Sequence, residues 1–267
     1  MKIHPTAIIA DGAKLAPGVE VGPFSIVSAE SEIGPGCVIG AHVVLEHRVV
    51  LGEGTKVGHG TILGANPQDL SFDPSRKDSG VRIGKGNTIR EYVTIHRGTK
   101  ENGDTLVGDG NFLMTGFHMG HDSVVENQVI AANNVLLAGH VRVQDRAFLG
   151  GGTVFHQFME VGSLAMVRGG CRFSKDIPPF LVATGENHVA GINAVGLRRA
   201  GFSADARKDI KRAFRLLYQS GLNVTQALEA SAGESWGPEA TMLLEFVRDA
   251  KKRGICDYVG KGTVDEE

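Results

Sequence analysis

The residues of this chain with the clearest chemical potential are histidines in its middle third. The segment FHMGHDSVV carries His118, His121 and Asp122, and His140 and His156 follow in LLAGHV and VFHQF. An imidazole can accept a proton near neutral pH, and an adjacent carboxylate can orient it. These residue types therefore suit general-base catalysis, provided that the fold brings them to one place.

The elements that carry these residues follow from a six-residue repeat. Every sixth residue from Ile3 to Leu63 is aliphatic, and the repeat resumes in a new phase from Ile83 to Val167. A period of six fits neither a helix nor an alternating strand. It is typical of an all-β left-handed parallel β-helix, in which each coil buries its apolar edge against its neighbours. With three hexads to a coil, residues about 18 apart should lie directly above one another.

This spacing predicts a vertical column of His121, Gly139 and Gln157, with steps of about 4.8 Å between neighbouring strands. An imidazole would then lie one rung from a glycine backbone, whose N–H can stabilise an oxyanion. The column therefore predicts an acyl-transfer site. We expect His118 and His140 near the same corner, on adjacent rungs but outside the column.

Two other interpretations of the histidines stay open at this point. They could fill corners of the coil or contacts between subunits. They could also bind a metal, although zinc needs three converging ligands. His118 and His121 are three residues apart, which in a strand places them on opposite faces, so we expect no metal site.

The repeat is interrupted twice and then ends. Residues 65–82 are polar and change the phase of the repeat, and a smaller excursion is expected near 98–105. Long loops on a rigid scaffold often carry function. We expect the β-helix to occupy residues 1–186 and a C-terminal α-helical domain to occupy 187–267.

The C-terminal region shows helical spacing. One helix is expected to begin after the N-cap Ser203 and to end at Gly221, and another to run from Pro238 to Arg253. Four basic residues share one face of the first helix: Lys208, Lys211, Arg212 and Arg215. This face is either a solvated surface or a docking patch for an acidic partner.

Composition narrows the function classes. A net charge of -2 predicts no bulk attraction to nucleic acid. The three cysteines are scattered, which favours a reducing compartment over a disulfide framework. No apolar run approaches the roughly 20 residues of a membrane helix, and the repeat begins too early for a signal peptide. We expect a soluble, cytoplasmic protein without a cofactor, because no P-loop or dinucleotide fingerprint is present.

Six segments resemble the acyl-carrier-protein–UDP-N-acetylglucosamine O-acyltransferase family: IREYVTIHRGT, FHMGHDSVV, IAANNVLLAGHVRV, VFHQF, KDIPPF and GLRRAGFS. The resemblance covers almost the whole chain, including its tail. It implies transfer of a 3-hydroxyacyl group from acyl carrier protein to the 3-hydroxyl of UDP-N-acetylglucosamine, in lipid A biosynthesis. It also implies a homotrimer and no covalent intermediate.

The same resemblance implies roles for individual residues. His121 matches the general base, Asp122 its partner, and Gly139 the oxyanion donor. Other positions match contacts to the sugar (Asp69, His118 and His140), positions near the substrate (His156 and Gln157), the nucleotide end (Asn193 and Arg199) and the acyl-length determinant (Gly169).

Three positions depart from the family pattern. Ser71 stands where the family usually has a lysine, Val195 where an acidic residue is common, and Ala200 where a second arginine is found. Arg76 or Lys77 could take the place of the lysine. The departures leave open a related acyltransferase that acts on an amino sugar nucleotide or another amine. A metal-binding β-helix such as a gamma-class carbonic anhydrase is the third alternative.

Overall fold

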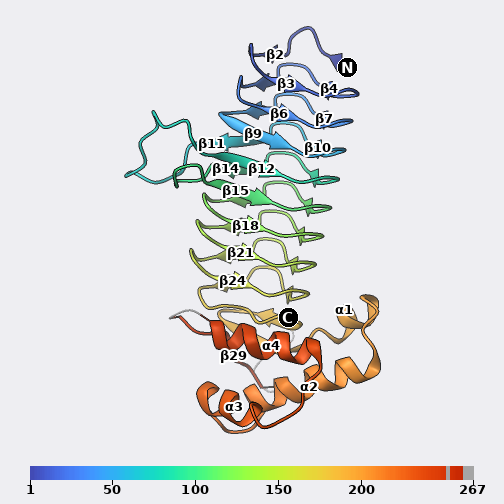
Figure 1. Ribbon diagram of the computed structural model, residues 1–267, viewed down its shortest axis with the longest axis vertical. Helices are drawn as coiled ribbons and strands as arrows, with labels where there is room; N and C mark the ends of the chain where they lie inside the picture. Colours follow the sequence, from blue (N-terminus) through green and yellow to red (C-terminus); the bar gives the residue numbers. More distant parts are fainter. Residues whose placement is uncertain (251–252, 261–267) are drawn as a thin grey trace.

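The computed structural model describes residues 1–250 and 253–260. Coils stack into a long column, and the C-terminal helices pack at its lower end (Figure 1). Each coil contributes one short strand to each of three sheets, so the column is a three-sided prism. The predicted repeat thus sets the architecture.

The strands of each sheet follow one another at the same place in successive coils. The first sheet contains β1 (Lys2–Ile3), β4 (Glu20–Val21), β7 (Val38–Ile39), β10 (Lys56–Val57), β13 (Thr88–Ile89), β16 (Phe112–Leu113), β19 (Ile130–Ala131), β22 (Phe148–Leu149), β25 (Met166–Val167), β27 (Leu181–Thr184), β28 (His188–Ile192) and β29 (Asp257–Tyr258). The second contains β2 (Ile8–Ile9), β5 (Ile26–Val27), β8 (Val44–Leu45), β11 (Ile62–Ala65), β14 (Thr94–His96), β17 (His118–Met119), β20 (Leu136–Leu137), β23 (Val154–Phe155) and β26 (Arg172–Phe173). The third contains β3 (Lys14–Leu15), β6 (Glu32–Ile33), β9 (Arg48–Leu51), β12 (Gly80–Ile83), β15 (Asp104–Val107), β18 (Val124–Val125), β21 (Arg142–Val143) and β24 (Glu160–Val161).

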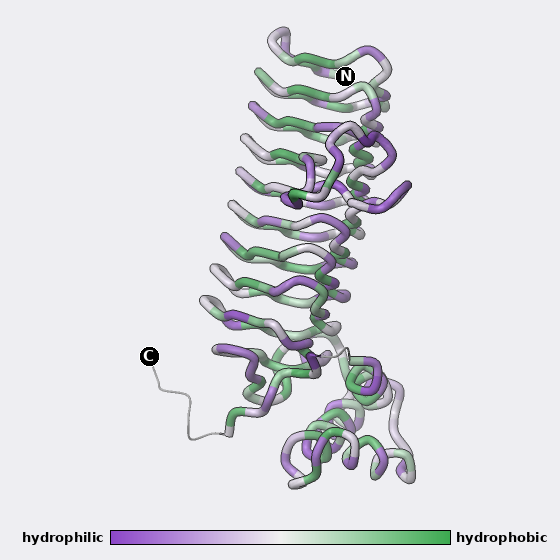
Figure 2. The backbone as a smooth tube through the Cα atoms, turned by 90° about the vertical axis from the view of Figure 1, so that its left-hand side faces the viewer, coloured by the Kyte–Doolittle hydropathy of each residue, from purple (hydrophilic) through white to green (hydrophobic). Residues whose placement is uncertain are grey.

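The aliphatic residues of the repeat form the core. In most two-residue strands the second residue points inward, as Val27, Leu45 and Leu137 do, and these are at most 1% exposed. Hydrophobic stretches recur from coil to coil along the column (Figure 2). Because each coil buries these side chains only against its neighbours, stacking is what stabilises the fold.

The pairing register confirms the coil length in the region of the histidines. His118 pairs with Leu136, and Leu136 pairs with Val154, in parallel strands. The two excursions are shorter than the sequence predicted. β11 ends at Ala65 and β12 begins at Gly80, so the large loop is 66–79, and β15 already begins at Asp104. The ends of both predicted loops instead continue the strands.

Four helices lie in the C-terminal region: α1 (Ala194–Arg199), α2 (Ala204–Gln219), α3 (Val224–Ser231) and α4 (Pro238–Asp249). Ser203 caps α2 as predicted, since its hydroxyl accepts from Ala206 N. The predicted end of α4 at Arg253 is wrong, because the helix stops at Asp249. The sequence also placed residues 188–192 with the helices, whereas they form β28, which pairs antiparallel with β27. No helix in the described part of the chain is long and apolar enough to span a membrane.

Candidate active site

The predicted catalytic residues meet at the corner of the coil between the second and third sheets, after β17 and β20. His140 N donates to His121 O at 2.9 Å, and Phe158 N donates to Gly139 O at 3.2 Å, so these turns stack rung on rung. The imidazole of His121 lies against Gly139: a Cβ added there would be 2.7 Å from both Cε1 and Nε2 of the ring. The column expected from the repeat is therefore present.

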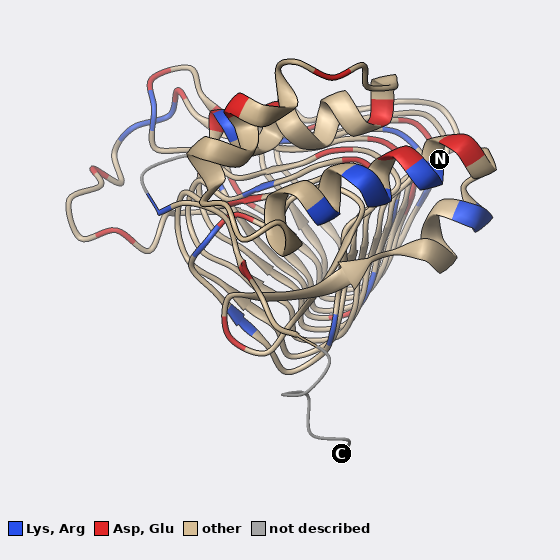
Figure 3. Cartoon of the chain, turned by 90° about the horizontal axis from the view of Figure 1, so that it is seen from below, with Lys and Arg blue, Asp and Glu red and all other residues tan. Residues whose placement is uncertain are grey.

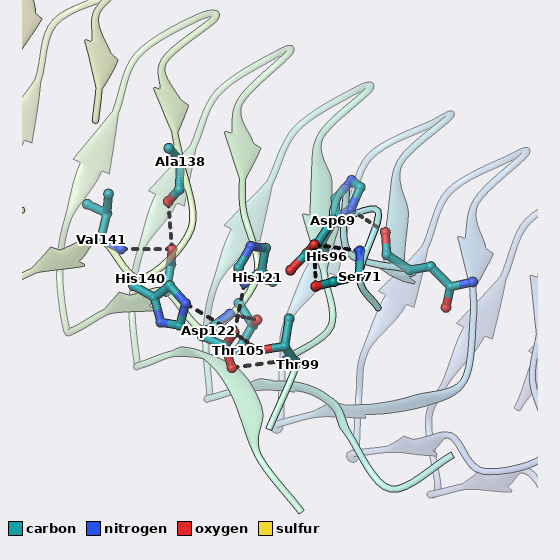
Figure 4. A network of polar contacts seen from close by, with 12 residues as sticks. Asp69, Ser71, His96, Thr99, Thr105, His121, Asp122, Ala138, His140 and Val141 are labelled. Carbon is teal, nitrogen blue, oxygen red and sulfur yellow. Dashed lines mark hydrogen bonds and ion pairs between the residues drawn. The ribbon is translucent and has the colours of Figure 1, made fainter. Parts of the chain in front are cut away.

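Asp122 orients the His121 ring. The Nδ1 of His121 lies 2.7 Å from Asp122 Oδ2, and the carboxylate is only 5% exposed (Figure 4). Burial raises the pKa of Asp122, but hydrogen bonds from Thr99 and His121 outweigh burial and bring the pKa below its usual value. An ionised carboxylate only accepts hydrogen bonds, so Nδ1 carries the proton. This leaves the Nε2 lone pair facing Gly139.

The backbone of Gly139 completes the arrangement. Among the hydrogen bonds found in residues 1–250 and 253–260, none uses the Gly139 N–H as its donor. A proton acceptor, His121 Nε2, thus lies beside a backbone donor with no protein partner. This pairing can deprotonate a hydroxyl and stabilise the oxyanion that forms when the hydroxyl attacks an acyl group.

His140 packs around the same carboxylate. Its Nε2 lies 3.7 Å from Asp122 Oδ2, and its ring meets the His121 ring edge to face at 5.1 Å. On its other side it stacks on Phe158, with ring centroids 4.4 Å apart. These contacts fix His140 next to the base.

His118 and His96 form a second histidine pair on the adjoining rungs. Their rings meet edge to face at 5.2 Å, and His118 Nδ1 lies 2.8 Å from Thr94 Oγ1. Burial, with a contribution from His96, lowers the pKa of His118 to about 4. His118 is therefore neutral near pH 7 and can exchange hydrogen bonds with a sugar hydroxyl.

Asp69 approaches the site from the 66–79 loop. Its Oδ1 accepts from Ser71 N at 2.9 Å and from Ser71 Oγ at 2.8 Å. These bonds, chiefly the one from the backbone, lower the pKa of Asp69. Figure 4 shows Asp69 and Ser71 on the opposite side of His121 from His140. Ser71, in the position where a lysine was expected, holds the Asp69 carboxylate.

Arg76, one of the two residues suggested in place of the missing lysine, has other partners in the structure. Its guanidinium binds both oxygens of Asp78, at 3.1 and 2.8 Å, and donates to Thr99 O at 2.9 Å. These contacts lie within the loop and its base. Lys77 is exposed.

The remaining predicted residues are distributed more widely. Gln157 continues the column, and the neighbouring His156 accepts from Arg253 at 2.8 Å. Asn193 caps α1, accepting from Gly196 N and donating to Leu164 O, both at 2.9 Å. Arg199 lies exposed in the last turn of α1, and Gly169 stacks on Gly151 at a different corner of the coil. One chain therefore does not bring Asn193, Arg199 or Gly169 to the His121 corner.

Two threonines that sequence reasoning missed hold Asp122. Thr99 donates to it through Oγ1 at 2.6 Å and through its amide at 3.0 Å. Thr105 Oγ1 accepts from Asp122 N at 2.9 Å. Thr99 lies within the second interruption of the repeat, between β14 and β15, and that break was the one available signal.

A possible metal cluster differs from the one considered in the sequence. His121, Asp122 and His140 each offer a ligand atom, and these atoms lie within 4.8 Å of one another. The prediction of no metal site considered only His118 and His121, whereas the ligand atoms that converge belong to His121, Asp122 and His140. However, Asp122 Oδ2 already accepts from His121 and Thr99, and an ion would have to displace both bonds. The three side chains therefore form a general base, His121, with a hydrogen-bonded carboxylate beside it.

Comparisons with known proteins agree over nearly the whole chain. Residues 176–256 match the family model described as UDP-N-acetylglucosamine O-acyltransferase, domain 2, and residues 30–65 match the bacterial transferase hexapeptide model. An acyl-[acyl-carrier-protein]–UDP-N-acetylglucosamine O-acyltransferase from Paraburkholderia phymatum is 46% identical, covering 95% of this chain and 98% of its own length. One from Thiobacillus denitrificans is 47% identical with the same coverage.

Solved structures of the same family also superpose on this chain. A UDP-N-acetylglucosamine acyltransferase from Campylobacter jejuni superposes with a TM-score of 0.90 at 35% identity, covering 97% of this chain and 100% of that one. One from Bacteroides fragilis has a TM-score of 0.85 at 39% identity, covering 94% and 98%. These likenesses confirm the left-handed parallel β-helix with C-terminal helices. The chain belongs to the acyl-[acyl-carrier-protein]–UDP-N-acetylglucosamine O-acyltransferase family.

Proposed function

We propose that this protein transfers a 3-hydroxyacyl group from acyl carrier protein to the 3-hydroxyl of UDP-N-acetylglucosamine, a step of lipid A biosynthesis. One observation carries the proposal: the bond from Nδ1 to Asp122 holds His121 Nε2 against Gly139, whose amide has no hydrogen-bond acceptor among the described residues. The names of the relatives identify the donor and the acceptor.

In the proposed mechanism, His121 Nε2 removes the proton of the sugar hydroxyl as the oxygen attacks the thioester carbonyl. The carbonyl oxygen becomes negatively charged and accepts a hydrogen bond from Gly139 N–H. In comparable sites one such bond stabilises the transition state by about 3–4 kcal/mol. Asp122 stabilises the imidazolium. When the C–S bond breaks, His121 returns the proton to the leaving thiolate, so no covalent acyl-enzyme is needed.

We assign the substrate positions as the family resemblance implies. His118, His140 and Asp69 contact the sugar, and they surround His121 on neighbouring rungs and on the loop. Gln157 follows Gly139 in the same column, and His156 is its neighbour in the chain. Three more residues have proposed roles at a distance from this corner: Asn193 and Arg199 toward the nucleotide, and Gly169 at the end of the acyl chain.

A homotrimer would explain why these residues are split between corners. The second sheet presents apolar residues outward, with Ile8, Ile26 and Leu136 between 42% and 61% exposed. The third sheet instead carries charged pairs such as Lys14–Glu32. Burying the apolar face against a second copy would bring the corner of one chain near that of another.

We place the donor protein on the basic face of α2. Lys208, Lys211 and Arg215 are exposed along a groove of about 630 Å³, and Figure 3 shows basic residues along this helix. Arg212 is engaged elsewhere: it stacks over Trp236 at 4.0 Å and pairs with Asp209 at 3.1 Å. The other three are therefore the residues offered to an acidic carrier protein. We also propose a cytoplasmic location, which suits the three free, buried cysteines.

The decisive experiment measures turnover of UDP-N-acetylglucosamine with a panel of 3-hydroxyacyl carrier proteins. His121→Ala should lower kcat by at least about 10³-fold, because it removes the base, while His4→Ala, which changes an exposed histidine at the N-terminus, should not. A folded His121→Ala protein with normal turnover would contradict the mechanism. Faster turnover of a 3-amino sugar nucleotide than of the 3-hydroxy substrate would instead support the alternative in which the acceptor is an amine, which the departure at Ser71 suggested.

A further inference from the structure

We infer that Arg97 is a positioning residue: its buried guanidinium clamps the 66–79 loop onto the β-helix and sets the distance between Asp69 and the His121–Asp122 pair. The inference rests on the proposed function, in which this loop holds part of the acceptor. It concerns a residue that touches none of the reacting atoms.

The environment of Arg97 is unusual for an arginine. Its side chain is fully buried, with 0% exposure, and arginine is rarely buried unless it is paired. Its backbone is fixed directly after β14, where Arg97 N donates to Ala65 O at 3.0 Å. Burial lowers the pKa of the guanidinium from its usual value, but an arginine pKa starts high enough that the charge remains. This buried charge therefore needs compensating oxygens.

The loop supplies those oxygens. The guanidinium donates to Asn66 Oδ1 at 3.0 Å, to Arg76 O at 2.6 Å and to Pro74 O at 3.4 Å. The ring of Phe72 lies 4.9 Å from the guanidinium carbon, within reach of a cation–π contact. One side chain thus binds the beginning, the middle and the end of the loop. The planar fork of arginine can do this, whereas a lysine ammonium cannot.

Other contacts hold the loop mainly near its two ends. His96 Nδ1 lies 2.6 Å from Asn66 O, Arg48 donates to Asp78 O at 3.3 Å, and Arg76 donates to Thr99 O. Leu70 is fully exposed, and the backbone bonds within the loop are those of two turns, Phe72 N to Asp69 O at 3.1 Å and Arg76 N to Asp73 O at 3.2 Å. Few buried contacts mean low local stability. Removing the clamp should therefore loosen this segment while the coils remain intact.

A continuous set of hydrogen bonds links the clamp to the base. Arg97 holds the Arg76 carbonyl, the Arg76 side chain donates to Thr99 O at 2.9 Å, and Thr99 donates to the Asp122 carboxylate. Asp122 in turn holds His121. Figure 4 shows Thr99 between the loop and this pair. The same residues therefore position both sides of the site.

The test compares Arg97→Met with Arg90→Met, which alters an exposed arginine that pairs with the adjacent Glu91. Hydrogen exchange should show loop amides 66–79 opening at least about tenfold faster in Arg97→Met, with unchanged coils. The KM for UDP-N-acetylglucosamine should rise about tenfold, with the KM for the acyl carrier protein unchanged and kcat reduced less than about threefold. Arg97→Lys should recover only part of the loss.

If Arg97→Met folds poorly, Phe72→Ala provides a second test. It removes the ring that lies over the Arg97 guanidinium and should therefore weaken the clamp. A folded variant with wild-type exchange in the loop would overturn the inference, as would an equal rise of KM for both substrates. The exchange readout needs no turnover. If the wild-type protein transfers no acyl group, the proposed function fails, while the loop measurement still decides whether Arg97 is a clamp.

Discussion

Gly139→Ala should remove most of the activity while leaving the fold intact. The new methyl group would lie 2.7 Å from Cε1 and Nε2 of His121, whereas carbon contacts are ordinarily about 3.5–4.0 Å. The imidazole must therefore move by about 1 Å. A shift of that size is large compared with the tolerance of the 2.7 Å bond from Nδ1 to Asp122 that orients the ring.

The expected loss follows from that displacement. A misplacement of about 1 Å in a catalytic group costs about 10²-fold in rate, or about 2.7 kcal/mol of transition-state stabilisation. Alanine keeps the backbone N–H, so the oxyanion donor remains and the loss reports the position of His121 alone. Stability should change by less than about 1 kcal/mol, because the φ of Gly139 is not in the left-handed region and alanine restricts the unfolded chain.

Steady-state kinetics with both substrates, together with thermal unfolding, measures these effects. Gly233→Ala is the matched control, since a Cβ there meets no atom within 4 Å. In a His121→Ala background, Gly139→Ala should cost nothing more, because the ring it displaces is gone. Two results would refute the idea that activity depends on the contact between His121 and Gly139. One is a wild-type kcat in folded Gly139→Ala, and the other is a double variant whose loss of kcat is the product of the two single losses.

Two further predictions concern charge. The pKa of His118 in the folded protein, about 4, lies below the usual histidine value of 6.5, so the unfolded chain binds more protons between these two pH values. The free energy of unfolding should fall by up to about 3 kcal/mol as pH drops from 6.5 to 4. Urea titrations at several pH values should show that the free energy of unfolding depends less steeply on pH in His118→Gln. The same pH dependence in variant and wild type would contradict the burial argument. Lys211→Glu with Arg215→Glu should raise the KM for acyl carrier protein about tenfold and leave that for the sugar nucleotide alone; equal KM values for variant and wild type would dismiss this docking face.

The sequence predicts the β-helix well because one physical requirement recurs in every coil. Each coil must place an aliphatic residue inward, so the pattern from Ile3 to Leu63 directly reports the stacked core. In the C-terminal region no residue type must recur at a fixed spacing, and there the predicted secondary structure is partly wrong. Residues 188–192 form β28 because β27 offers an open edge, which depends on tertiary pairing rather than on local pattern.

The same reasoning explains which site residues were found. His121 and Gly139 are one coil apart in an uninterrupted stretch, so their spacing translates into contact. Thr99 lies within the second excursion, and across that excursion Thr94 pairs with a residue 24 positions later, His118, instead of 18. The count of residues therefore no longer points from Thr99 to Asp122. Arg97 is hidden for another reason: its burial depends on the loop folding back over it, which no periodicity encodes.

The corner next to the base shows how the site and the scaffold constrain each other. Asp122, His140 and Phe158 occupy one position on successive rungs, with φ values of 58°, 61° and 68°. A left-handed backbone costs non-glycine residues roughly 1–2 kcal/mol each. Some other corners avoid the cost with glycine, as at Gly36 and Gly54, although several do not. Here the side chains contact one another, through the Asp122–His140 approach and the His140–Phe158 stack. These contacts offset part of the strain, and glycine at Asp122 would leave His121 without the carboxylate that orients it.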